Sequence, residues 1–284
     1  MKKISTQFQI ENNVLIWCKT DARKVVIPEG VTEIGIHAFD LHTNMVSVTI
    51  PKTVKKIGKK AFFGCGSLTS IIIPNGVTEI GAYAFDGCTS LSNVVISDSV
   101  TRIGSHAFFA CTSLTSVVIP GSVIEIGDYA FRSCTSLTNV VLPDTVSKIG
   151  SFPFYLCKIH ELHSKLINIT NGLCIEGNKL LYCPDRSLTS IIIPDAISEI
   201  GENAFYGLNL RNVTIPISVT KIGNDAFSGC ARKSGSVIIN NIQIIGDFAD
   251  QSLLTIIYKG SKSQWEKIEG SEQDDLKDIV VFEA

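Results

Sequence analysis

A repeat of 23 residues constrains the fold of this sequence more than any other feature. Its clearest marker is a cysteine that recurs at this interval, and the five copies are Cys65, Cys88, Cys111, Cys134 and Cys157. An Ile-Gly pair keeps this spacing from Ile34-Gly35 to Ile149-Gly150 and occurs nine times in the chain. A unit of this length cannot bury its own apolar face, so successive units must stack. The period therefore predicts a solenoid of about nine turns.

The order of residues within a unit predicts its local structure. The segment 68–73 has the apolar spacing of a short strand, and Pro74 ends it because proline cannot donate a ladder hydrogen bond. Gly81 permits a sharp turn, and 84–88 fits one turn of helix. Stacking then adds each strand to a parallel sheet, at a spacing of about 4.8 Å.

One column of the repeat carries charges of alternating sign. Its six members are Glu33, Lys56, Glu79, Arg102, Glu125 and Lys148. In stacked strands, opposite charges attract and like charges repel by a few tenths of a kcal/mol. The alternation favours stacking in register, with this column at a solvated edge.

Two segments outside the period resemble each other, namely 8–18 and 173–183. Both contain a bend, at Asn12-Asn13 and at Gly177-Asn178, and both lead into an Ile-Pro block, which predicts two β-hairpins. We expect the first to cap the N-terminal end of the stack and the second to interrupt the stack.

The C-terminal end predicts a second cap. Residues 254–260 form an expected last strand, 261–268 a short helix and 279–282 a closing edge strand. Trp265 and Ile268 are expected to cover the exposed end of the core.

These features divide the chain into five expected regions. They are an N-terminal capping hairpin in 1–27, a first repeat block in 28–157, an irregular interruption with the second hairpin in 158–193, a second repeat block in 194–250 and a C-terminal cap in 251–284.

The repeat carries four marks together, which in one unit are Ile73-Pro74, Ile80-Gly81, Ala84-Phe85 and Cys88-Thr-Ser-Leu91. With these marks the chain resembles the BspA-type (treponemal) class of bacterial leucine-rich repeat proteins over nearly its whole length. The resemblance implies a right-handed leucine-rich-repeat solenoid, a β-dominated member of the α/β horseshoe class with short helical turns. It also implies binding of a protein or extracellular-matrix ligand, commonly by secreted or surface proteins of host-associated bacteria and some protists.

Charge and hydropathy exclude other classes of partner. The chain has 25 Lys and Arg against 27 Asp and Glu, a net charge of −2, so we expect no binding to nucleic acid. Its apolar runs are far shorter than the roughly 18 residues that span a bilayer, so we expect no membrane insertion. No apolar leader follows Met1. We expect a cytoplasmic location if Met1 is the native start, and a secreted or surface location if a leader was removed.

The candidate chemical sites favour structural roles. The cysteine ladder, which Cys230 extends, is expected to consist of free, buried thiols because parallel Cβ atoms at strand spacing lie too far apart for disulfides. At the break, Cys157 with His160 and His163 is a possible metal or thiol site, but it lacks zinc-site spacing, and solvated histidines are the favoured interpretation. We find no catalytic or phosphate-binding motif and expect neither enzymatic activity nor a cofactor.

One residue in each strand, between the last two core positions, should point outward. These residues are Val26, Thr49, Ile72, Val95, Val118, Val141, Ile192, Thr214, Ile238 and Ile257. The β-branched residues suit any strand, and a contiguous apolar stripe also suits a binding surface, so both interpretations stay open. We predict a non-enzymatic interaction module that binds a protein or extended ligand on this face. The alternative is self-association into a homo-oligomer through the same stripe.

Overall fold

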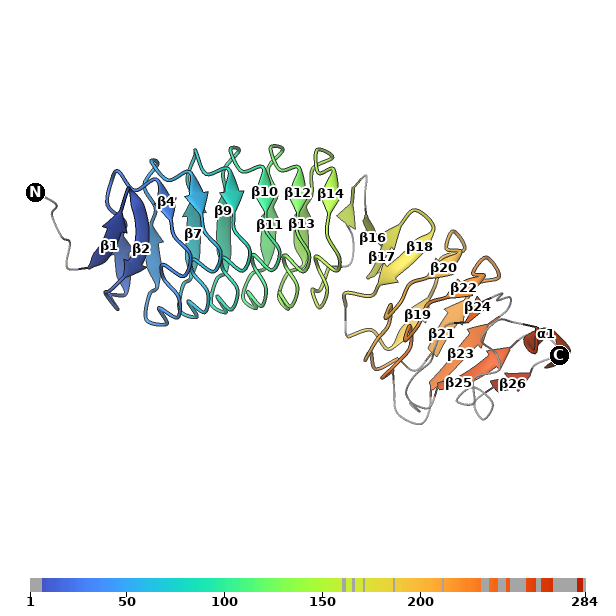
Figure 1. Ribbon diagram of the computed structural model, residues 1–284. Coiled ribbons are helices and arrows are strands. Elements are labelled where there is room, and N and C mark those ends of the chain that lie inside the picture. The colour runs from blue at the N-terminus through green and yellow to red at the C-terminus, as the bar shows by residue number, and fades with distance from the viewer. Residues whose placement is uncertain are drawn as a thin grey trace, which may run out of the picture. The chain divides into compact units, whose positions relative to one another are not determined.

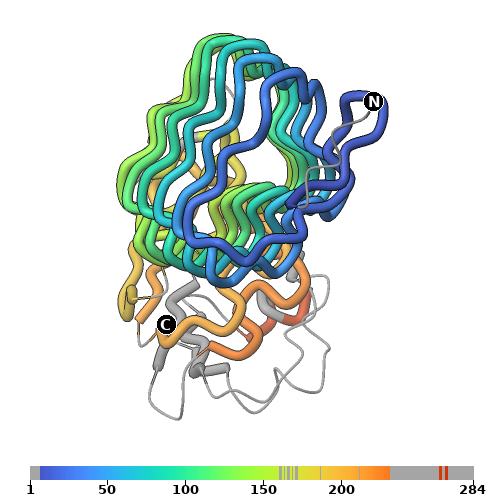
Figure 2. The backbone as a smooth tube through the Cα atoms, turned by 90° about the vertical axis from the view of Figure 1, so that its left-hand side faces the viewer, coloured from blue at the N-terminus to red at the C-terminus, as the bar shows by residue number. Residues whose placement is uncertain are grey.

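In the computed structural model the chain forms two units, residues 1–166 and 167–284. The described residues are 7–159, 162–164, 167–170, 172–185, 187–210, 212–230, 235–239, 244–245, 254–258, 262–267 and 280–282. Within each unit, successive turns of the chain, here called rungs, lie side by side (Figure 1). Seen along the stack, the rungs of the first unit nearly superpose (Figure 2). The predicted solenoid with parallel strands is confirmed.

Each rung of the first unit contains one strand of three or four residues, here called a long strand. The long strands are β3 (Lys24–Val26), β5 (Ser47–Thr49), β7 (Ser70–Ile73), β9 (Asn93–Ile96), β11 (Ser116–Val118) and β13 (Asn139–Val141). The strands β7 and β9 pair in parallel, with Ile72 opposite Val95. In β7, Ile71 and Ile73 are buried while Ile72 is exposed, as the period of two requires.

The stack contains a second parallel sheet, whereas the sequence predicted only one. Its two-residue strands, here called short strands, are β4 (Glu33–Ile34), β6 (Lys56–Ile57), β8 (Glu79–Ile80), β10 (Arg102–Ile103), β12 (Glu125–Ile126) and β14 (Lys148–Ile149). Every isoleucine of the Ile-Gly pairs thus lies opposite the next one along the stack, as Ile80 does with Ile103. The core therefore lies between the short-strand sheet and the long strands, which form a four-stranded sheet from β3 to β9 and a two-stranded sheet of β11 and β13.

The alternating charges lie opposite one another in the short-strand sheet, which confirms their predicted register. Arg102 lies between two glutamates, 2.8 Å from Glu79 and 3.4 Å from Glu125. Lys148 continues the ladder at 3.1 Å from Glu125. Such partly exposed pairs contribute little stability each, and their main effect is to disfavour a shifted register, which would place like charges together.

Glycine follows each short strand because neighbouring rungs approach closely there. A Cβ atom on Gly81 would lie 2.6 Å from the carbonyl carbon of Gly58 and 2.7 Å from the oxygen of Ile57. Gly81 does not have a positive φ, so close approach of two backbones, and not the predicted sharp turn, explains it.

The predicted helical turn after Gly81 is instead a pair of tight turns. The amide of Ala84 donates to the oxygen of Gly81 at 3.2 Å, whereas Phe85 donates to Ala107 of the next rung at 2.7 Å. Tyr83 has a left-handed φ of 59°, which ends any helix. Because alternate amides bond to the neighbouring rung, the turns satisfy their backbone groups by stacking.

The N-terminal hairpin is confirmed and starts the short-strand sheet. Strand β1 (Phe8–Glu11) pairs in antiparallel fashion with β2 (Val14–Cys18), which runs parallel to β4. The amide of Gly35 donates to Leu15 and the amide of Cys18 donates to Ala38, both at 2.8 Å. The hairpin therefore both accepts and donates hydrogen bonds at the first rung.

A second hairpin leads into the short strands of the second unit. It consists of β17 (Leu173–Glu176) and β18 (Lys179–Tyr182), and β18 runs parallel to β20 (Glu199–Ile200). Because β17 also pairs with a preceding strand, the expected interruption is built into the interior of this sheet, whereas the first hairpin lies at a sheet edge. The first unit ends with β15 (Leu162–His163), and the second begins with β16 (Asn168–Thr170), which pairs with β17. Short strands β22 (Lys221–Ile222) and β24 (Ile244–Ile245) follow β20.

The long strands of the second unit are also parallel. They are β19 (Ser190–Ile192), β21 (Asn212–Ile215), β23 (Gly235–Ile239), β25 (Leu254–Tyr258) and β26 (Val280–Phe282). The predicted last strand, short helix and closing strand are confirmed as β25, α1 (Lys262–Trp265) and β26. The expected contacts of Trp265 and Ile268 with the end of the core lie outside the described side chains.

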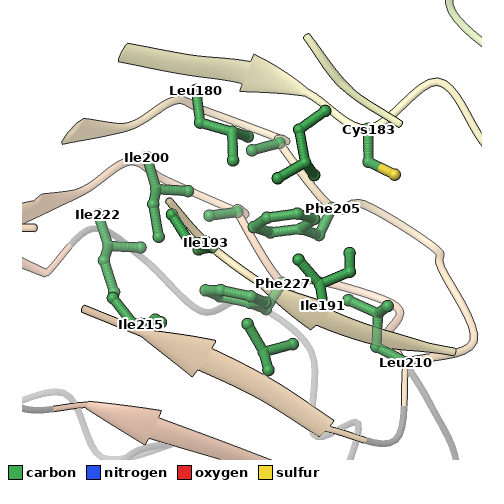
Figure 3. Packing of buried hydrophobic residues seen from close by; sticks show 14 of the residues in the cluster. Leu180, Cys183, Ile191, Ile193, Ile200, Phe205, Leu210, Ile215, Ile222 and Phe227 are labelled. Carbon is green, nitrogen blue, oxygen red and sulfur yellow. The ribbon is translucent and has the colours of Figure 1, made fainter. Parts of the chain in front are cut away.

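A column of phenylalanines fills the centre of each unit. In the first unit Phe85 stacks between Phe62 and Phe108, with ring centroids 5.1 and 5.2 Å apart. In the second unit Phe205 stacks on Phe227 at 5.0 Å, among the aliphatic side chains of the sheets (Figure 3). The stacked rings make each rung's core continuous with the next.

Candidate functional site

The outward residues of the long strands form an exposed apolar stripe in the first unit. The exposed fractions are 66% for Ile72, 47% for Val95, 61% for Val118 and 51% for Val141. Thr49 and Val26 are exposed beside them. At strand spacing, Thr49 and Val141 lie about 19 Å apart along the stack. We call this surface, Val26 to Val141, the long-strand face.

In the second unit, Ile192 is 78% exposed and lies opposite Thr214, which is half-buried. Ile238 and Ile257 continue that column in the backbone register, although their side chains lie outside the described ones.

The long-strand face carries no charge from β5 to β13, since these five strands contain only Ser, Thr, Asn, Val and Ile. Next to it, hydroxyl groups bond to the preceding rung: Thr69 to the oxygen of Val46 at 3.3 Å, and Ser92 to that of Thr69 at 3.2 Å. The polar border is thus fixed in place. A flat apolar centre with a polar rim and few charges is the composition of a protein interface core.

The cysteine ladder is a structural feature of the core. All nine cysteines are free and buried, as predicted for the ladder positions. The thiol of Cys88 donates to the oxygen of Phe62 at 3.2 Å, and that of Cys111 to Phe85 at 3.3 Å. Cys65, Cys134, Cys157 and Cys230 make the same bond to a phenylalanine of the preceding rung. Cysteine suits this column because it is small and apolar and still donates a weak hydrogen bond.

Burial makes these thiols poor nucleophiles. It raises the pKa of Cys111 and Cys157 well above the usual value, and that of Cys174 to about 12. At Cys134 burial also raises the pKa, but hydrogen bonds from the thiols of Cys111 and Cys157 outweigh it and lower the pKa to about 5. Because all six ladder cysteines are fully buried, an external electrophile does not reach them in the folded protein.

The possible metal site at the break gains no support. Cys157 is buried and bonded to Phe131, while His160 and the side chain of His163 lie outside the described part of the chain. Within that part, no three His, Cys, Asp or Glu side chains are grouped closely enough to hold a metal ion. The described residues also contain no helix that is long and apolar enough to cross a membrane.

Ion pairs dominate the electrostatics of the short-strand sheet. The ammonium of Lys148 and the guanidinium of Arg102 hold the pKa of Glu125 below its usual range. In the second unit, Lys179, 2.8 Å away, and Lys221, 3.4 Å away, do the same for Glu199. These two carboxylates are committed to structural partners in the ladder of charges.

The recurring residues of the repeat did not reveal a cluster of rings and cations on the tight turns. It combines the residue before each Ala-Phe or Pro-Phe pair with the residue after that pair. The cluster, here called the turn-side cluster, comprises Lys60, Phe63, Tyr83, Asp86, His106, Phe109, Tyr129, Arg132, Phe152 and Tyr155. The signal was present as a run of aromatic residues at two variable positions of the repeat.

A small hollow of about 260 Å³ also lies beside the N-terminal hairpin. Trp17 and His42 line it with their rings 5.7 Å apart, and His42 contacts the oxygen of Cys18 at 3.0 Å. The pattern of the repeat did not reveal it, because the hairpin lies outside the period.

Comparison with known proteins agrees with this architecture. The family model for the BspA type leucine rich repeat region matches in six copies, over residues 9–123, 101–176 and 177–270. No curated protein matches the chain.

Solved structures of bacterial proteins have a similar fold. A leucine rich cell surface protein of Faecalibacterium prausnitzii A2-165 is 25% identical, with a TM-score of 0.64 over 92% of this chain and 95% of its own. A leucine-rich repeat protein of Eubacterium ventriosum ATCC 27560 is 23% identical, with a TM-score of 0.63 over 91% and 72%. The pneumococcal vaccine antigen PcpA is 16% identical, with a TM-score of 0.52 over 99% and 98%.

The rungs stack with their Ile-Gly, Ala-Phe and cysteine residues in columns. Together with a family match over most of its length, this shows that the chain belongs to the BspA-type leucine-rich repeat family.

Proposed function

We propose that the protein is a non-enzymatic interaction module whose long-strand face binds a protein ligand. The repeat family supports a protein-interaction or surface repeat module, and one similar solved protein is described as a cell surface protein. The observation that carries the proposal is the exposure of one aliphatic residue in each of four consecutive rungs, on a face without charge. These residues are Ile72, Val95, Val118 and Val141.

Strand propensity alone explains β-branched residues, but it does not explain the lack of charge. A lysine or glutamate at one of these outward positions would protect the strands from unwanted association. The chain uses charge freely in the adjacent short strands, where it alternates in sign. A partner that covers the long-strand face accounts for the difference, because burying an unpaired charge in an interface is costly.

The test compares two triple variants against a panel of purified extracellular-matrix proteins by surface plasmon resonance. The site variant replaces Ile72, Val95 and Val118 by lysine. The matched control replaces three other exposed aliphatic residues, Ile36, Leu41 and Ile124, by lysine. We expect the wild type and the control to bind at least one panel protein, and the site variant to bind it at least about tenfold more weakly.

Equal binding by the site variant would place the interface elsewhere, and no binding by the wild type would contradict a matrix-protein ligand. Light scattering on the same samples addresses self-association. If the wild type is a dimer and only the site variant is a monomer, the face joins two copies of this chain instead.

A further inference from the structure

The turn-side cluster of the first unit occupies positions where large side chains are costly. Tyr83, His106, Tyr129 and Phe152 all have left-handed backbone conformations, with φ between 50° and 59°. The equivalent residues in the second unit are Asn203 and Asp225, which adopt this conformation more readily. The aromatic residues are therefore not what the turn itself requires. Strained positions that carry an unexpected side chain are a recognised mark of a functional surface.

Stacking aligns these rings along the solenoid. The rings of Tyr83 and His106 are 4.4 Å apart and inclined by 10°, and those of Tyr129 and Phe152 are 5.9 Å apart and inclined by 7°. His106 connects the two pairs, at 5.0 Å from Tyr129. Within the pairs Tyr83–His106 and Tyr129–Phe152 each ring covers the face of the other, whereas His106 and Tyr129 are inclined by 42°. The two stacked pairs therefore present ring edges to their surroundings. Ring edges carry partial positive charge.

Cations reinforce this positive character at both ends of the column. The guanidinium of Arg132 lies 5.2 Å from the rings of Tyr129 and Tyr155, and the ammonium of Lys60 lies 5.0 Å from the ring of Phe63. Arg132 has no carboxylate partner among the described residues, whereas Arg102 of the short strands has two. Its Nε atom is buried without a hydrogen bond. The rings thus hold a guanidinium in place without neutralising it.

Two acidic groups lie near the column, Asp86 within the cluster and Asp128 beside His106, and neither forms an ion pair with Arg132. The carboxylate of Asp128 accepts a hydrogen bond from the amide of Ser151 at 2.7 Å. Burial raises the pKa of Asp86 to about 6, although the charge of Lys60 opposes the rise. Burial and the charge of Arg132 lower the pKa of His106, so this imidazole is neutral at pH 7. Arg132 remains available to an external anion.

We propose that the turn-side cluster is a second binding site, in which Arg132 binds a carboxylate of an acidic peptide segment from a partner protein. The planar guanidinium matches a carboxylate in bidentate geometry. Tyrosine and arginine together are typical of protein interface hot spots. A sugar chain would need open ring faces on which to stack, and stacking covers the facing sides of the rings in the pairs Tyr83–His106 and Tyr129–Phe152. The site is separate from the long-strand face and does not depend on it.

Fluorescence polarisation of the full chain with a dye-labelled peptide of alternating alanine and glutamate tests the proposal. The assay uses about 50 mM salt, so that charge interactions are only partly screened. We expect saturable binding that Arg132→Gln weakens by about tenfold or more, the scale of a lost charge-assisted hydrogen bond. Arg132→Lys retains the charge without the planar fork and should weaken binding by a smaller factor.

Arg102→Gln is the matched control, since it removes the same charge from the short-strand sheet, and it should leave the affinity within about twofold. A peptide of alternating alanine and glutamine should not bind. Equal weakening by both glutamine variants would show a general charge effect and overturn the site. Binding of a polyuronate oligosaccharide in place of the peptide would overturn the peptide assignment. Circular dichroism of each variant confirms that the solenoid is folded.

Discussion

Replacing Gly104 by alanine tests whether close approach of the rungs determines the glycine column. The new Cβ atom would lie 2.6 Å from the amide nitrogen of Ala82 and 2.8 Å from the carbonyl carbon of Gly81. Ordinary contacts of a Cβ atom begin near 3.4 Å, so the two rungs must separate by several tenths of an ångström. Both neighbouring atoms belong to the backbone and cannot rotate away.

The expected cost follows from what this separation disrupts. The amide of Gly104 donates to Ile80 at 2.8 Å, and that of Thr101 to Thr78 at 2.9 Å. Weakening one or two such bonds costs about 1 kcal/mol each, and overpacking adds about 1–3 kcal/mol. We therefore expect Gly104→Ala to lower the free energy of unfolding by about 2–5 kcal/mol.

Gly121→Ala is the matched control, because a Cβ atom there meets no atom within 4 Å and the residue has no positive φ. It should change the free energy of unfolding by less than about 1 kcal/mol, toward greater stability. Urea titration followed by circular dichroism measures both variants. Equal stability of the two would refute the argument, since backbone contact distinguishes them.

Three further predictions concern the core and the charge ladder. Cys111→Ala removes a buried sulfur and its hydrogen bond to Phe85, and should lower the free energy of unfolding by about 1–3 kcal/mol in the same titration. All nine thiols are buried, so they should react with a thiol reagent only after unfolding. The ion pairs of Glu125 lower its pKa in the folded state. They therefore stabilise the fold fully at pH values above the ordinary glutamate pKa of about 4.3. This stabilisation is lost as the pH falls through the folded-state pKa. Glu125→Gln should therefore melt with a weaker dependence on pH between about 3 and 6 than the wild type; identical pH profiles would contradict this.

The period of the sequence predicted the stack, because a repeated unit has only one way to bury every copy of Phe85 and Cys88. The charge column also predicted the register, since opposite signs at Glu79 and Arg102 require them to be neighbours. The exposure of Ile72 follows from simple alternation. These predictions depend only on the spacing of residues along the chain, and each repeat shows the same spacing again.

What the sequence did not predict depends on contacts between rungs. A strand of two residues, such as Glu79–Ile80, is too short to show alternation, so the second sheet gave no signal. The tight turns at Tyr83 differ from a helix because amides bond to the next rung, which no local pattern encodes. Arg132 lies at a variable position of the repeat, so the recurring pattern does not distinguish it.

The hydrogen bonds of the hairpins fix the direction in which rungs follow one another in each stack. At the first rung the amide of Gly35 needs an acceptor and the oxygen of Ala38 needs a donor, and Leu15 and Cys18 of the hairpin supply them. The second hairpin repeats this with Leu180 for Gly201 and Cys183 for Ala204. A hairpin of this kind fits only the leading end of a stack, since at the trailing end donors and acceptors exchange places. Each hairpin therefore fixes the direction in which the parallel rungs after it are added, and this chain contains two such hairpins.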